Sequence, residues 1–129
     1  MLPRTKARKH ALDILHAADA LDRPALEVLA ESAEAKEFTR ELVLGVEEHR
    51  AELDDLIRRY ADRWALERMP IVDRNLLRLG IFELLHRPDI PPAATINEAV
   101  ELAKLLSTED SGRFVNGLLG RVAREHARA

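Results

Sequence analysis

The sequence predicts an all-α fold of about seven helices, and three observations support this prediction. Apolar residues recur at three- and four-residue steps through most of the chain, which is the spacing of one helix face. No segment shows the strict alternation of a half-buried strand. The 129 residues, 47% of them hydrophobic and 33% charged, are enough for one domain with a core.

The composition also excludes several classes of protein. No run approaches the roughly 18 to 20 apolar residues of a membrane span, and no apolar signal region follows the basic start, so a cytoplasmic protein without membrane contact is expected. There is no cysteine, and the five histidines form no H-x-x-x-H pair, so no metal site and no cofactor are predicted. The common nucleotide-binding, hydrolase and zinc-protease motifs are absent, and an enzyme is not expected.

The first half of the chain predicts three helices. Apolar residues fall on one side from Thr5 to Leu21, and the segment 22–24 (DRP) ends that helix. A short helix follows around residues 26–33. A long helix is expected from Ala35 to Tyr60, because its apolar residues continue at helical steps. His49 lies on that stripe and is expected to be packed and hydrogen-bonded rather than a ligand.

The start of the chain is basic. Its first ten residues hold Arg4, Lys6, Arg8 and Lys9 with no acid, on a chain whose net charge is −3. Such a cluster attracts a polyanion, although a solvated, frayed terminus is an equal interpretation of the pattern alone. The periodicity places at least Lys6 and Lys9 on a helix whose other face is anchored.

The centre of the chain holds its most apolar helix. Asp73 is expected to be its N-cap, with Val72 packed on the first turn as a hydrophobic staple. The apolar residues cover more than half of the circumference, so other elements must surround the helix. Phe82 shares the remaining arc with Arg74 and Arg78. Unless a second core covers that face, we expect Phe82 to be exposed and to anchor a protein partner.

Two further helices complete the predicted fold after a proline-rich loop. Thr95 and Glu98 are expected to form a capping box that starts one helix, and the polar turn 107–112 leads into the last helix. Gly117 and Gly120 project away from the apolar stripe of that last helix. Alanine would be preferred there, so either another helix or the backbone of a partner is expected to pack close to them.

Three motifs point to a known family. They are VDR at 72–74, INEAVELAK at 96–104 and FVNG at 114–117, within a region of dense similarity across residues 64–120. In these motifs the chain resembles the NusB family of bacterial transcription antitermination factors. The spacing of the second and third motifs is highly specific.

The resemblance implies a fold, an activity and partners. The fold would be two packed helical subdomains, about residues 1–62 and 63–129. The activity would be binding of the boxA RNA of ribosomal leader transcripts together with NusE, within an antitermination complex on RNA polymerase; some members are homodimers. Two alternatives stay open, namely a NusB-like domain detached from a ribosomal RNA methyltransferase and a helical scaffold that binds only protein.

The resemblance also nominates site residues. It implies RNA contacts at Arg4, Lys6, Arg8, Lys9, Tyr60, Arg78, Asp110 and Phe114, with Asp110 at a position where charge affects RNA binding. It places Asp73 at a position facing NusE, and the arc described above adds Arg74, Arg78 and Phe82. Tyr60 and Phe114 also lie on apolar stripes, so they are as readily core residues, and Asp73 is alternatively only a cap.

Overall fold

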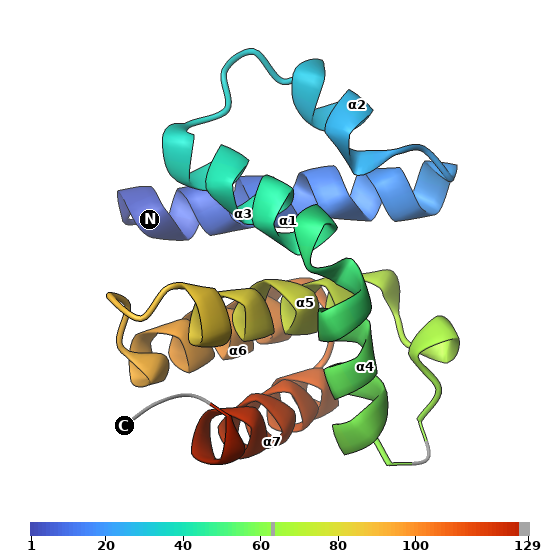
Figure 1. Ribbon diagram of the computed structural model, residues 1–129, viewed down its shortest axis with the longest axis vertical. Coiled ribbons are helices and arrows are strands. Elements are labelled where there is room, and N and C mark those ends of the chain that lie inside the picture. Colours follow the sequence, from blue (N-terminus) through green and yellow to red (C-terminus); the bar gives the residue numbers. More distant parts are fainter. Residues whose placement is uncertain (63, 127–129) are drawn as a thin grey trace.

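The computed structural model describes residues 1–62 and 64–126, and these residues form seven α-helices, one 3₁₀ helix and no strand (Figure 1). The elements in order are α1 (Pro3–Leu21), α2 (Ala25–Ala30), α3 (Glu37–Glu48), α4 (Arg50–Tyr60), η1 (Leu66–Arg68), α5 (Ile71–His86), α6 (Pro92–Leu106) and α7 (Glu109–Glu125). The all-α class predicted from the sequence is confirmed. None of these helices is both long and apolar enough to cross a membrane.

Helix α5 lies in the middle of the molecule, as its apolar density predicts. It packs against α1 and α3 on one side and against α4, α6 and α7 on the other (Figure 1). Leu77 and Ile81 are completely buried, and even polar residues of this helix are buried. Burial on all sides explains why its apolar residues cover so much of the circumference.

The long helix expected from Ala35 to Tyr60 is instead two helices that meet at His49. The backbone of His49 has φ −107° and ψ 17°, and its N–H still donates to the carbonyl of Gly45 at 3.0 Å. The bend directs α4 away from α3 and onto α5 and α7. The apolar stripe continues through the bend, so its periodicity cannot reveal it.

The start of α5 differs from the sequence prediction. The helix begins at Ile71 after Pro70, whose carbonyl accepts from the N–H of Arg74 at 3.1 Å. Asp73 therefore lies in the first turn, and it is not the N-cap. Its side chain is completely buried and accepts a hydrogen bond of 2.7 Å from the hydroxyl of Ser111 on α7.

The two C-terminal helices are capped differently from the prediction. Helix α6 begins at Pro92, so Thr95 and Glu98 lie inside it and form no capping box. Their side chains instead bind other helices, and Thr95 donates to Glu83 of α5 at 2.8 Å. Helix α7 has a true side-chain cap within the predicted polar turn, because the hydroxyl of Thr108 accepts from the N–H of Ser111 at 2.9 Å.

Candidate nucleic-acid interface

The first turns of α1 present exposed positive charge. Pro3 begins the helix, and the side chains of Arg4 and Lys6 are exposed. Lys9 is partly exposed and pairs with Asp13, one turn later, at 3.1 Å. This exposed pair contributes little to stability, so Lys9 is free to exchange it for a phosphate. Three of the four cations predicted at the start of the chain are therefore available to a ligand.

Arg8 is the exception, because its guanidinium is buried between helices. Its Nε and Nη2 donate to the two carboxylate oxygens of Glu83 at 2.8 and 2.9 Å, and its Nη1 donates to Glu98 at 3.2 Å. Burial disfavours the charge of Arg8, but hydrogen bonding and charge from Glu83, followed by Glu98, outweigh burial and raise its pKa. Arg8 fastens α1 to α5 and α6, and it offers no free donor face to a phosphate.

A groove of about 710 Å³ runs between the start of α1 and the start of α3. Its lining includes Arg4 and Lys6 from α1, together with Lys36 and Phe38 from the start of α3. The guanidinium of Arg4 lies 4.6 Å from the centroid of the Phe38 ring, a cation–π geometry. This groove combines cations with an aromatic face, which are the two features that bind single-stranded nucleic acid.

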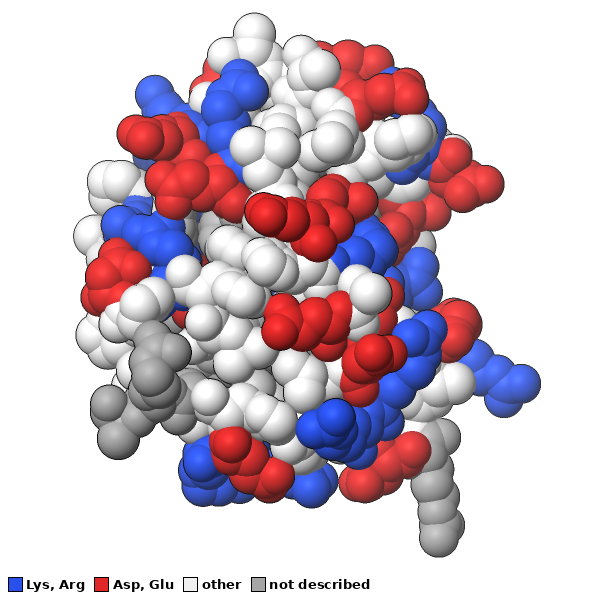
Figure 2. All heavy atoms as spheres, in the orientation of Figure 1, with Lys and Arg blue, Asp and Glu red and all other residues white. Residues whose placement is uncertain are grey.

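The charge around the molecule is nevertheless mixed. Glu37 and Glu41 also line the groove. Figure 2 shows Lys and Arg interleaved with Asp and Glu over the face it displays, without one continuous basic surface. Binding of a polyanion must therefore depend on a few local cations rather than on the field of a whole face.

A second exposed group lies near the start of α7. Phe114 is half-buried and packs against Trp64, with ring centroids 4.7 Å apart, and the Trp64 side chain is 37% exposed. Asp110 is exposed in the first turn of α7 and pairs with Arg113. In Figure 1 the start of α1 lies on the opposite side of the molecule from the segment that joins α4 to α5, and Trp64 belongs to that segment by sequence. The structure therefore does not bring the nominated RNA contacts into one site.

Tyr60 is a core residue. Only 6% of it is exposed, and its hydroxyl donates to Glu125 at 2.8 Å and lies 2.6 Å from His126. Arg121 covers the ring at 4.7 Å from its centroid. Desolvation together with Glu125 raises the pKa of Tyr60. Of the two alternatives for this residue, the structure bears out burial, and a base cannot stack on the covered ring.

Arg78 is buried in an ion network rather than exposed to RNA or protein. Its guanidinium donates to Asp54 at 2.7 Å and to Asp19 at 3.1 Å. Asp19 also accepts from Asn75 at 2.9 Å and from Arg74 at 3.2 Å. Burial raises the pKa of Asp19, but the hydrogen bond from Asn75 and the charges of Arg78 and Arg74 outweigh it and hold that pKa below 3.8. This network joins α1, α4 and α5.

The expected exposure of Phe82 is wrong, because a second core covers that face of α5. Only 7% of Phe82 is exposed. Its ring lies against Gly45 of α3, where an added Cβ would overlap the ring. The imidazoles of His49 and His86 lie beside it, with centroids 6.1 and 5.5 Å away. Phe82 is therefore a packing residue between α3 and α5.

The surroundings of Gly117 and Gly120 on α7 decide whether another helix of this chain packs against them, which was one of the two explanations offered by the sequence. No described atom lies within 4 Å of a Cβ built on Gly117, and one built on Gly120 would meet only the guanidinium of Arg124 at 3.4 Å. Within the described residues, no other helix packs close to them. The remaining explanation, close approach by a partner, stays a prediction.

Comparison with known proteins identifies the family. A profile of the NusB family matches residues 5–124. The chain belongs to the NusB family. The transcription antitermination protein NusB of Salinispora arenicola is 51% identical over 131 residues, covering 95% of this chain and 96% of that protein. The corresponding protein of Myxococcus xanthus is 50% identical over 131 residues, covering 93% and 94%.

Solved structures of NusB proteins share the fold. A structure of T. maritima NusB has a TM-score of 0.90 and 42% identity, covering 98% of this chain and 94% of that one. A structure of antitermination factors NusB and NusE in complex with dsRNA has a TM-score of 0.86 and 29% identity, covering 95% and 97%. The NusB family consists of transcription antitermination factors and not of enzymes.

The NusB resemblance and the structure together sort the nominated residues. On the surface or partly exposed are Arg4, Lys6, Lys9, Arg74, Asp110 and Phe114. Buried are Arg8, Tyr60, Asp73, Arg78 and Phe82. The expected exposure of this group is not observed, because each of these side chains is buried within the fold. Whether they contribute to partner binding stays a prediction.

The sequence alone did not identify several residues that the fold places beside Arg4 or beside Phe114. Lys36, Phe38 and His10 join Arg4 in the groove, and Trp64 joins Phe114. Lys36 and Phe38 lie about thirty positions from the basic start, so only the packing of α3 on α1 brings them together. Trp64 is the single tryptophan of the sequence, but its exposure, which makes it a candidate contact, is visible only in the structure.

Proposed function

We propose that this chain is a transcription antitermination factor that binds boxA RNA of ribosomal leader transcripts jointly with NusE, within an antitermination complex on RNA polymerase in the cytoplasm. The observation that carries this proposal is the match to antitermination proteins named NusB at 51% identity over 96% of their length. A NusB and NusE structure with dsRNA has the same fold at a TM-score of 0.86. Both observations concern relatives, so the RNA-binding residues of this chain are proposed from its own structure.

RNA binding at the start of α1 rests on Arg4, Lys6 and Lys9. These cations lie on an anchored helix, so ordering them on a phosphate backbone costs less conformational entropy than ordering a free tail. Lys36 extends the positive charge across the groove. The Phe38 ring holds the guanidiniums of Arg4 and Arg87 beside the groove, 4.6 and 5.4 Å from its centroid. We place the sugar–phosphate backbone along this groove.

The Trp64 and Phe114 pair belongs to a different contact. Trp64 belongs to the segment joining α4 to α5, which lies on the opposite side of the molecule from the start of α1 (Figure 1), and its ring packs on Phe114. Asp110 and Arg113 beside it provide charge of both signs, which suits a protein surface as well as RNA. We therefore propose this group, with the partly exposed Arg74, as contacts outside the phosphate path.

The two rival functions predict different behaviour. A domain detached from a ribosomal RNA methyltransferase is disfavoured, because the relatives that the chain covers almost completely are named as antitermination proteins. A scaffold that binds only protein would associate with NusE and show no salt-dependent affinity for RNA. Homodimer formation stays a prediction.

The experiment is a fluorescence-anisotropy titration of boxA RNA with and without NusE at several salt concentrations. Lys6→Gln should weaken binding and reduce the slope of log K against log salt by about 0.7, the value for one phosphate contact on a single strand. Lys104→Gln is the matched control, because Lys104 is exposed on α6 and does not line the groove. Its slope should equal that of the unmodified protein.

Two outcomes would contradict the proposal in different ways. Salt-independent affinity, or no binding to boxA RNA with NusE present, would reject RNA binding as the function. Normal binding with equal slopes for Lys6→Gln and Lys104→Gln would keep the function and move the phosphate contacts away from α1.

A further inference from the structure

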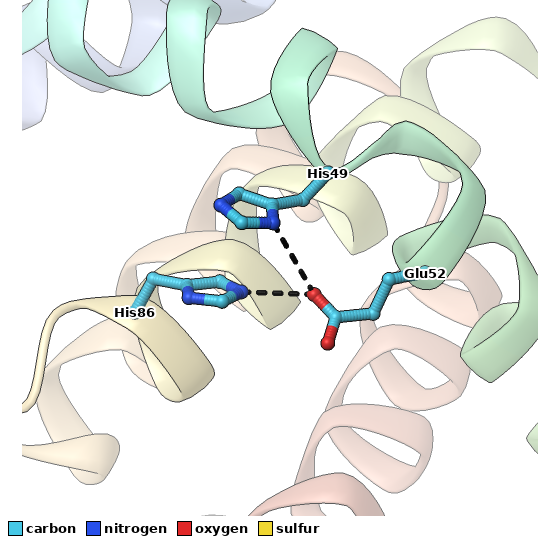
Figure 3. A group of neighbouring side chains, drawn as sticks. All are labelled: His49, Glu52 and His86. Carbon is cyan, nitrogen blue, oxygen red and sulfur yellow. Dashed lines mark hydrogen bonds and ion pairs between the residues drawn. The ribbon is translucent and has the colours of Figure 1, made fainter.

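Three side chains that bind metals in other proteins meet where α3, α4 and α5 come together. His49 lies at the junction of α3 and α4, Glu52 in the first turn of α4, and His86 in the last turn of α5. Nε2 of His86 lies 2.9 Å and Nδ1 of His49 3.6 Å from the same oxygen, Oε1 of Glu52 (Figure 3). The three potential ligand atoms lie within 4.8 Å of one another.

The charge around the cluster comes mainly from Glu52. Helices α3 and α5 end here with negative partial charge, whereas α4 begins here with positive partial charge, so the helix ends partly offset one another. The Glu52 carboxylate adds a full negative charge. An open hollow of about 550 Å³ adjoins Glu52 and His86, so an ion and its water ligands have access from solvent. That hollow also holds Asp55 and the opposing cation Arg59.

The cluster has a firm base. The imidazoles of His49 and His86 stack with centroids 3.8 Å apart and planes at 16°, and both rest beside the buried ring of Phe82. Among the described residues, Glu52 is the carboxylate that both imidazoles approach, at 2.9 Å from His86 and 3.6 Å from His49. The packing therefore holds two imidazole nitrogens and one carboxylate near one point, with one ring rotation separating them from a shared ligand geometry.

We propose that His49 Nδ1, His86 Nε2 and Glu52 Oε1 bind one Zn²⁺ ion, with water completing the coordination. Zn²⁺ takes imidazole nitrogen and carboxylate oxygen at about 2.0 to 2.2 Å, usually four-coordinate, and three protein ligands leave a position for water. For both nitrogens to point at one ion, one stacked ring turns about its Cβ–Cγ bond. The side chains of His49 and His86 are 31% and 29% exposed, which leaves space for that rotation.

Binding at this site would tie the end of α5 to the bend between α3 and α4. The ion is thus a clamp across the bend, over the core formed by Phe82 and Gly45. It binds the folded chain and not the unfolded one, so it raises the melting temperature in proportion to the logarithm of its concentration above Kd. This site lies outside the groove proposed for RNA, and the inference does not depend on that function.

The test is a titration of the full chain with ZnCl₂, followed by calorimetry, and with CoCl₂, followed by the visible absorption of four-coordinate Co²⁺. One ion should bind per chain. His86→Gln and Glu52→Gln should each weaken binding beyond the roughly 10- to 100-fold that losing an outer hydrogen-bond partner of a metal ligand costs. His16→Gln on α1 is the control, since His16 is outside the cluster and its variant should bind like the unmodified protein.

The nitrogens assigned here are checked by NMR of the histidine side chains. Zn²⁺ should shift Nδ1 of His49 and Nε2 of His86 and leave His16 unchanged. His86 and Glu52 are partly exposed, so both variants should fold, which circular dichroism verifies. No binding at millimolar Zn²⁺, or equal affinity in Glu52→Gln and His16→Gln, would overturn the proposal and leave a stacked histidine pair hydrogen-bonded to a glutamate.

Discussion

Replacing Arg8 tests whether its positive charge stabilises the fold or binds RNA. Arg8→Met keeps the length of the aliphatic stem and removes the guanidinium. Glu83, whose side chain is 2% exposed, then keeps a buried carboxylate that only Thr95 still bonds among the described side chains. The variant tests whether a cation in the basic start of the chain serves stability alone.

The magnitude follows from the geometry. Arg8 makes two hydrogen bonds to Glu83, at 2.8 and 2.9 Å, and its own side chain is 9% exposed, so solvent screens the pair weakly. Removing one partner of a buried ion pair costs about 3 to 5 kcal/mol, because the other charge stays buried without compensation. The melting temperature should therefore fall by about 10 °C or more.

The assay combines urea unfolding with RNA titration. Arg8→Met with Glu83→Gln should recover more than half of the lost stability, because no buried charge is then left unpaired. Lys6→Met is the matched control at the exposed surface: it should leave stability within about 0.5 kcal/mol and reduce the salt slope of RNA binding. If Arg8→Met melts like the unmodified protein and reduces the salt slope as Lys6→Met does, the structural role of Arg8 is wrong.

Three further predictions concern packing and pH. Gly117→Ala should raise the free energy of unfolding by about 0.5 to 1 kcal/mol, because the added Cβ meets open space. Gly45→Ala should lower the free energy of unfolding, because the added Cβ overlaps the Phe82 ring. Urea unfolding measures both changes, and a destabilised Gly117→Ala variant would contradict the argument. Phe82→Ala should cost about 3 to 5 kcal/mol in the same assay, and an unchanged stability with weaker NusE binding would restore its role as an anchor. Asp19→Asn should cost roughly 1.5 to 3 kcal/mol near neutral pH. Because the pKa of Asp19 is lowered by folding, this contribution is present above its unfolded value of 3.8 and is lost as pH falls toward the folded value, so parallel stability curves in acid would refute it.

The features that the sequence predicts correctly are local. The spacing of Leu76, Leu77 and Leu79 correctly predicts that other helices cover most of α5, although Arg74 and Arg78 on the remaining arc give no sign that this face is covered too. The segment 22–24 ends α1 as predicted, because Asp22 adopts the left-handed conformation as C-cap, with φ 53° and ψ 50°, and the N–H of Arg23 donates back to the carbonyl of Ala18. These inferences need only the residues of one helix or turn. The predicted caps at Asp73 and Thr95 are local as well, and they fail because these side chains bond Ser111 and Glu83 on other helices.

The candidate site is less predictable, because it depends on pairs far apart in the chain. Arg8 and Glu83 are 75 positions apart, and nothing in the spacing of either helix pairs them. In the sequence, Arg8 looks the same as an arginine that binds phosphate, and only its burial in the structure shows that it joins helices instead. The same holds for Asp73, which resembles a cap in sequence and bonds Ser111 of α7 in the structure.

The bend at His49 explains why the helix expected from Ala35 to Tyr60 is two helices. If α3 continued straight, α4 would leave α5, whereas Gly45, which precedes the bend, would still lie against Phe82. Because the chain turns at His49, α4 covers α5 and α7, while Gly45 leaves the space that Phe82 fills. The division into subdomains near residue 62 stays a prediction, and the packing of α4 favours placing that division at His49. The three potential metal ligands would then join the two parts at the point where the chain passes from one to the other.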